Sequence, residues 1–222
     1  MRQTMNTRER YAGWFYFGFQ LLVLPELLML CNSLLPRPMG SAQLNIALFI
    51  LNFAVILAIF HRFLWNGLTV ACKNVWRTLK SAFLAFCVYY VSNILVSGLI
   101  LRIMPEFFNV NDSSIDTMAA QSYTLMTFCV VVLVPVVEET LYRGLLFGRL
   151  YSKSKWLGYV VSVAVFAAIH VIGYVGQYEL RQLALCALQY LSRAGTSEAG
   201  EDCQRGRPRP AYRGDHAVFH LV

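Results

Sequence analysis

Charged residues are scarce in this 222-residue chain: they make up 14% of the sequence, whereas a soluble globular domain carries about 25%. Hydrophobic residues make up 57%, and the mean hydropathy is +0.51. The apolar residues form long uncharged runs and not alternating segments of about ten residues, which disfavours a β-barrel and indicates membrane-spanning helices. We therefore predict an all-α fold, a polytopic transmembrane helical bundle.

Paired cysteines are also missing. The six cysteines are scattered, and no CxxC pair or zinc-finger spacing occurs, so neither a disulfide framework nor a structural zinc site is indicated. The net charge of +7 comes from lysines and arginines that cluster between the apolar runs, where such residues set membrane topology. The basic balance therefore predicts the lipid bilayer as a partner and no nucleic acid.

Five apolar runs are long enough to cross a bilayer, which takes about 20 residues. We expect spans at residues 11–35, 44–60, 83–104, 121–151 and 157–175. A sixth run, residues 183–191, is too short and predicts an incomplete span. Pro25 predicts a kink in the first span. Between the spans we expect an interfacial helix at residues 66–80 and an acidic loop at residues 105–120.

Basic residues mark one side of the membrane. The N-terminus, residues 61–80 and residues 149–155 are basic, whereas residues 105–120 are not. Because positive loops stay in the cytoplasm, the N-terminus is predicted to be cytoplasmic. We expect a multi-pass protein of the cell membrane (plasma or inner membrane).

The last residues depart from the apolar pattern, because residues 192–222 are rich in charge, glycine and proline. We divide the chain into a membrane-embedded helical domain, residues 1–191, and this polar tail. Two explanations stay open: a disordered cytoplasmic tail, or a frameshift that replaced a membrane-spanning end. Sequencing the gene separates them, because a frameshift requires an apolar reading frame further downstream.

Glu138, Glu139 and Arg143 are charges inside an apolar run. A charge at membrane depth costs several kcal/mol unless it is paired or hydrated, so such a cluster is a candidate functional site. Residues four apart share a helix face, which lets Glu139 pair with Arg143, whereas Glu138 points about 100° away. This pairing leaves Glu138 as a candidate general base. The alternative is an ion pair that locks helices together without chemistry.

His170 ends the segment Phe166-Ala167-Ala168-Ile169-His170. A lone histidine in an apolar helix is more often a packing residue. Here the spacing favours a site, because Glu138 lies about 16 residues before the turn near residues 153–154 and His170 about 16 after it, roughly 24 Å along each arm. A helical hairpin would therefore bring a carboxylate and an imidazole to the same depth.

The two segments, Glu138-Glu139-x-x-x-Arg143 and Phe166-x-x-x-His170, resemble the first two motifs, EExxxR and FxxxH, of the CPBP family of intramembrane endopeptidases. This family comprises CAAX proteases and bacteriocin-processing (Abi) proteins, and the resemblance covers about residues 120–191. It implies that Glu138 and His170 activate a water that attacks a peptide carbonyl, with Glu139 and Arg143 in support. It implies no cofactor, although a zinc ion held by Glu138, Glu139 and His170 stays an alternative.

The family's third motif has no counterpart here. That motif, HxxxN or HxxxD on a later span, stabilises the oxyanion. The only histidines after His170 are His216 and His220, and neither fits the motif. Because the loss of one oxyanion donor costs about 10²–10³ in rate, we expect little or no proteolysis from this chain.

Two hypotheses about function follow. The first is an intramembrane endopeptidase of the CAAX type, inactivated by an altered C-terminus. A prenylated CAAX tail, a bacteriocin leader and an unrelated membrane peptide all fit as its substrate. The second is a non-enzymatic immunity or scaffold protein on the same helical framework. A proton-coupled transporter is less favoured, because the sequence has no internal repeat and no pair of Gly/Pro-broken helices.

Overall fold

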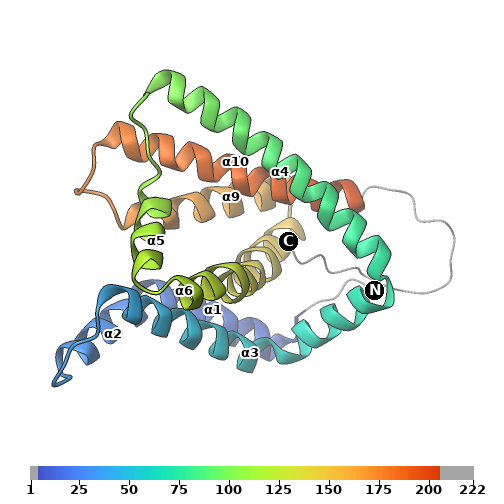
Figure 1. Cartoon of the computed structure of the whole chain (residues 1–222). Coiled ribbons are helices and arrows are strands. Elements are labelled where there is room, and N and C mark those ends of the chain that lie inside the picture. Colours follow the sequence, from blue (N-terminus) through green and yellow to red (C-terminus); the bar gives the residue numbers. More distant parts are fainter. Residues whose placement is uncertain (1–4, 206–222) are drawn as a thin grey trace, which may run out of the picture. The chain divides into compact units, whose positions relative to one another are not determined.

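The computed structural model describes the backbone of residues 5–205 and the side chains of residues 5–195, and this part of the chain contains helices and no named strand (Figure 1). In chain order the helices are α1 (Thr7–Leu22), α2 (Leu24–Ser33), α3 (Ser41–Lys73), α4 (Val75–Ile103), α5 (Val110–Gln121), α6 (Tyr123–Phe128), η1 (Cys129–Leu133), α7 (Val134–Glu138), η2 (Glu139–Phe147), α8 (Gly148–Tyr151), α9 (Lys155–Ile172) and α10 (Leu180–Arg205). The segments η1 and η2 are π-helices.

The predicted fold class is confirmed. Among the residues that the structure describes, four helical stretches are long and apolar enough to cross a membrane: Ser41–Lys73, Val75–Ile103, Tyr123–Tyr151 and Lys155–Ile172. The bent pair of α1 and α2 adds a fifth if it is one span. Helix α10 has 26 residues but is not among these apolar helices. The chain is a multi-pass helical membrane protein.

The chain divides into two compact units, each described by itself. We call one the carboxylate unit, because it carries Glu138, Glu139 and Arg143; its described residues are 5–66 and 114–148. We call the other the histidine unit, because it carries His170; its described residues are 67–113 and 149–205.

The break between α1 and α2 confirms the kink predicted from Pro25. The two helices are bent by 51° at Val23, and the proline occupies the first turn of α2 (Figure 1). A proline is tolerated there because the backbone N–H it lacks has no partner within the helix anyway.

Helix α3 runs past the predicted end of the second span at residue 60. It continues through His61 and Arg62 to Lys73, and α4 begins at Val75, so the predicted separate interfacial helix at residues 66–80 is wrong. A kink at Phe60 (φ −108°, ψ 18°) replaces the expected break. Basic side chains do not end a helix at a membrane surface, because their stems let the charges reach the headgroups.

Glu9 supports this kink. Its carboxylate accepts a hydrogen bond from the backbone N–H of Phe63 (3.3 Å), just beyond the non-helical residue, and another from the N–H of Asn6 (2.7 Å). The second bond belongs to the capping box of α1. Glu9 is 8% exposed, so one buried carboxylate satisfies donors at the start of α1 and at the bend of α3.

Gly13 lets α1 approach this bend, and replacing it tests the packing. A Cβ atom at Gly13 would overlap the Phe60 ring and lie 3.3 Å from Cδ2 of Leu145, whereas a Cβ at Gly18 of the same helix meets nothing within 4 Å. We expect Gly13→Ala to lower the free energy of unfolding by about 1–3 kcal/mol through overpacking. Gly18→Ala, the matched control, should be neutral or stabilise by up to about 1 kcal/mol. Equal unfolding midpoints of the two variants in detergent would contradict this packing.

Helix α5 replaces the acidic loop predicted at residues 105–120. Oδ1 of Asn109 accepts hydrogen bonds from the backbone N–H groups of Asn111 and Asp112, both at 3.1 Å, and so caps the helix. Asp112 in the first turn also stabilises the helix, because its negative charge lies near the positive N-terminal end of the helix dipole. The spacing of Asn109 and Asp112 is the local signal of a helix start that the prediction missed.

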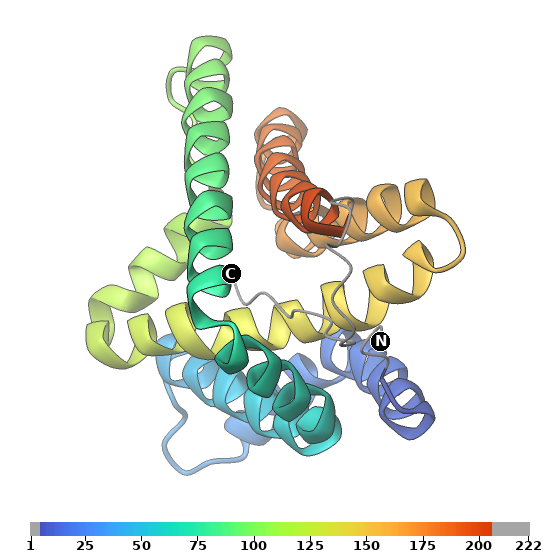
Figure 2. The ribbon, with the colours of Figure 1, turned by 90° about the vertical axis from the view of Figure 1, so that its right-hand side faces the viewer.

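The turn between α8 and α9 lies where the hairpin prediction placed it (right-hand side of Figure 2). The carbonyl of Leu150 accepts from the N–H groups of Lys153 (2.9 Å) and Ser154 (3.0 Å), and Ser154 caps α9 through Leu157 N–H. Gly158 then passes so close to Tyr151 that an added Cβ would lie 3.0 Å from Cα of that residue. Helix α9 therefore folds back against the last turn of α8.

Helix α10 does not end at the predicted domain boundary after residue 191. It continues through Ser192 and Arg193 to Arg205, packed along α4 and α9 (Figures 1 and 2). The reason is tertiary: Ser192 Oγ bonds Ser92 Oγ of α4 at 2.9 Å, and Arg193 forms an ion pair with Asp112. The two explanations of the tail stay predictions, and its residues 206–222 lie outside the described residues.

Candidate functional site

The carboxylate motif lies where the helix changes its hydrogen bonding. Helix α7 ends at Glu138 and the π-helix η2 begins at Glu139. Upstream, Pro135 has no N–H to donate, and the preceding residues form the π-helix η1, in which the N–H of Val134 donates to the carbonyl of Cys129 five residues back. Such i→i+5 segments are rare and recur at functional sites. The proline explains η1.

Glu139 and Arg143 form the predicted ion pair. Arg143 Nη1 lies 3.0 Å from Glu139 Oε2, and the side chains are 15% and 14% exposed. Glu138 precedes this pair and is half-buried. The pair neutralises two charges inside an apolar span, which lowers the cost of placing either one there.

The surrounding side chains hold the motif against α1 and α3 within the carboxylate unit. The Tyr142 ring packs edge-on against Phe17 of α1, with centroids 5.4 Å apart. A Cβ at Gly144 would lie 3.3 Å from Cε1 of Phe63, so this glycine permits close approach to the kinked α3. Thr140 is fully buried, and its hydroxyl donates to the carbonyl of Val136 at 2.7 Å. The segment therefore presents its carboxylates from a packed scaffold.

His170 is half-buried in the histidine unit, one turn after Phe166. Its Nδ1 lies 2.8 Å from the carbonyl oxygen of Phe166. A carbonyl oxygen only accepts, so Nδ1 carries the proton, and in the neutral ring Nε2 is the basic nitrogen. The imidazole also contacts two aromatic rings, Phe166 at 4.5 Å and Tyr190 of α10 at 4.4 Å between centroids.

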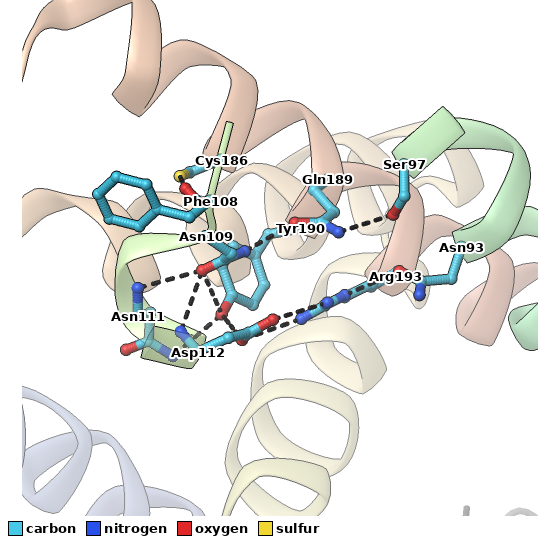
Figure 3. A network of polar contacts seen from close by, with 10 residues as sticks. All are labelled: Asn93, Ser97, Phe108, Asn109, Asn111, Asp112, Cys186, Gln189, Tyr190 and Arg193. Carbon is cyan, nitrogen blue, oxygen red and sulfur yellow. Dashed lines mark hydrogen bonds and ion pairs between the residues drawn. The ribbon is translucent and has the colours of Figure 1, made fainter. Parts of the chain in front are cut away.

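A polar network lies behind Tyr190 (Figure 3). The Tyr190 hydroxyl donates to Asp112 Oδ1 and accepts from Asn111 Nδ2, both at 2.9 Å. Burial raises the pKa of this phenol, and the Asp112 carboxylate raises it further, so the phenol stays protonated and donates. Arg193 donates to both oxygens of Asp112 (3.3 and 2.9 Å) and, through Nε, to Asn93 Oδ1 (3.2 Å).

The sequence interpretation missed this network. Gln189 extends it by accepting from Asn109 Nδ2 (2.8 Å) and donating to Ser97 Oγ (3.0 Å). The signal in the sequence was a polar stripe: residues 189, 190 and 193 share a face of α10, as residues 93 and 97 do on α4.

Glu138 and His170 belong to different units, so their predicted approach stays a prediction. Among the described residues, no group of three or more His, Cys, Asp or Glu side chains could hold a metal ion. The zinc alternative likewise stays a prediction, because two of its three ligands lie in one unit and the third in the other.

Comparison with known proteins bears on the segment that carries both motifs. Residues 120–194 match the family described as "Type II CAAX prenyl endopeptidase Rce1-like". No match was found among curated proteins or solved structures. The matched segment includes Glu138, Glu139, Arg143 and His170, and it extends three residues beyond the predicted limit at 191. The resemblance inferred from the two motifs is thereby confirmed: residues 120–194 match a family of CAAX-type membrane endopeptidases.

Proposed function

We propose that this chain is an intramembrane endopeptidase that hydrolyses a peptide bond with a water activated by Glu138 and His170. The observation that carries the proposal is that one family match encloses both motifs, in a chain whose Glu139–Arg143 ion pair is formed inside an apolar span. Glu138 is a carboxylate next to this pair in the chain, and a carboxylate is one of the side chains that can serve as a general base.

Each residue has a chemical role in this proposal. The Glu138 carboxylate takes a proton from the water as its oxygen attacks the scissile carbonyl, and the same proton goes to the leaving amine when the C–N bond breaks. His170 orients the water through Nε2, the basic nitrogen of a ring whose Nδ1–H donates to Phe166. Glu139 and Arg143 fix the helix that presents Glu138.

The substrate we propose is a prenylated peptide with a C-terminal CAAX sequence, because the family's description names that class. The rate should be low. The 222 residues contain no HxxxN or HxxxD after His170, and the loss of each oxyanion donor costs about 10²–10³ in rate.

A cleavage assay in liposomes tests the proposal. The intact protein, Glu138→Ala and His170→Ala are incubated with a prenylated CAAX peptide over long times, and the released tripeptide is measured by mass spectrometry. We expect slow release by the intact protein and by Glu26→Ala, and none by the two site variants. Glu26 is a matched control because it is an exposed carboxylate on α2.

Equal background release by all four proteins would remove the enzyme proposal and favour the non-enzymatic immunity or scaffold function. Cleavage of a bacteriocin-type leader, but not of the prenylated peptide, would keep the reaction and overturn the substrate. Both alternatives thus have their own outcome.

A further inference from the structure

Tyr190 lies outside both motifs, yet its ring stacks on the imidazole of His170. The centroids are 4.4 Å apart, and the planes differ by 24°. The Phe166 ring lies beside both, with its centroid 6.4 Å from that of Tyr190 and 4.5 Å from that of the imidazole. Two aromatic neighbours and the hydrogen bond from Nδ1 to the Phe166 carbonyl thus restrict the orientation of the imidazole.

The Tyr190 ring is itself held in place. Its hydroxyl donates a hydrogen bond to Asp112 and accepts one from Asn111 (Figure 3). The residue as a whole is 4% exposed. The Arg193 guanidinium lies 5.1 Å from the ring centroid and also holds Asp112 through two hydrogen bonds. Swinging the ring away about χ1 would therefore break the charge-assisted hydrogen bond from its hydroxyl to Asp112, which is of the stronger kind.

Simple packing does not require such contacts. Leu183 and Cys186 occupy the same buried stripe of α10, in the same cluster as Ala167 and Val171 of α9. These positions fill space with apolar atoms or a thiol. At the level of His170, the stripe instead carries an aromatic ring whose polar end is tied to α5.

We propose that Tyr190 is a positioning residue for His170. Its ring, held by hydrogen bonds to Asp112 and Asn111, keeps the imidazole where Nδ1–H donates to the Phe166 carbonyl, so that Nε2 is the basic nitrogen. This inference rests on the proposed function only in taking His170 as a residue that acts through its basic nitrogen Nε2. It gives α10 a part in the site, although no residue of α10 belongs to either motif.

The test is nitrogen NMR of the full chain labelled with ¹⁵N-histidine in lipid nanodiscs, at a pH where the ring is neutral. The His170 signals are assigned by their loss in His170→Gln. We expect one tautomer, Nδ1–H, in the intact protein. In Tyr190→Leu the minor tautomer should rise roughly two- to tenfold, the factor that corresponds to one weakened hydrogen bond. Tyr90→Leu, which removes an exposed ring from α4, should leave the spectrum unchanged.

A second variant keeps the test decisive if Tyr190→Leu does not fold. Tyr190→Phe retains the ring and loses the two hydroxyl contacts, and a smaller rise of the minor tautomer is expected. An unchanged His170 spectrum in the folded Tyr190 variants would overturn the proposal, even if His170→Ala abolished cleavage. In active protein, Tyr190→Leu should lower kcat by up to about 10²-fold with KM unchanged.

The NMR result also separates this inference from the proposed function. A tautomer change in Tyr190→Leu supports positioning, whether or not any peptide is cleaved. A failure of cleavage in every protein, including the intact chain, removes the enzyme and leaves the positioning of His170 in place.

Discussion

Arg143→Leu should lower the free energy of unfolding by about 3 kcal/mol, because it removes the guanidinium that offsets the cost of burying the Glu139 carboxylate. The Glu139 carboxylate is only 14% exposed and sits in an apolar span. Its pairing with Arg143 at 3.0 Å is the contact that the substitution removes. Equilibrium unfolding in mixed micelles measures the loss.

The double variant Glu139→Gln/Arg143→Leu separates the charge from the packing. It removes both charges at similar volume, so most of the lost stability should return. Arg77→Leu is the control, because Arg77 is an exposed arginine on α4. If Arg143→Leu is no more destabilising than Arg77→Leu, the ion pair contributes nothing to the fold of the carboxylate unit.

Glu138→Ala should lower kcat by about 10²–10⁴-fold, the usual contribution of a general base. The substitution also leaves the space that the half-buried Glu138 side chain occupied. Formate can enter that space and supply a carboxylate, so added formate should restore part of the rate. Single-turnover cleavage of the prenylated peptide, with and without formate, measures both effects.

Glu139→Ala provides the contrast. Its carboxylate is bound to Arg143, so the loss should appear mainly as lower stability, and formate should not restore the rate. Rescue of Glu139→Ala but not of Glu138→Ala would exchange the two roles. Rescue of neither variant would remove the general-base role from Glu138.

Hydropathy alone was sufficient to predict the all-helical, multi-pass architecture, because crossing a bilayer demands long apolar runs. Local rules also predicted the α1–α2 break near Pro25, the turn at residues 152–154 and the Glu139–Arg143 pair. Each of these depends on neighbours within about four residues, which a single sequence displays.

The missed features depend on contacts between distant residues. Glu9 stabilises the bend at Phe60 by accepting a hydrogen bond from the backbone N–H of Phe63, which is 54 residues away in the chain. Helix α10 continues beyond residue 191 because Arg193 meets Asp112. Helix α5 differs, because its cap at Asn109 was visible in the sequence and the acidic composition obscured it.

The Asp112–Arg193 ion pair also has a consequence for biosynthesis. The two residues are 81 positions apart, and a ribosome adds about 5–20 residues per second, so Asp112 waits roughly 4–16 s for its partner. During that interval α5 carries a carboxylate without its guanidinium, and the Tyr190 hydroxyl has not yet arrived. The pair therefore forms only in chains whose translation has passed Arg193, and it distinguishes them from shorter nascent products.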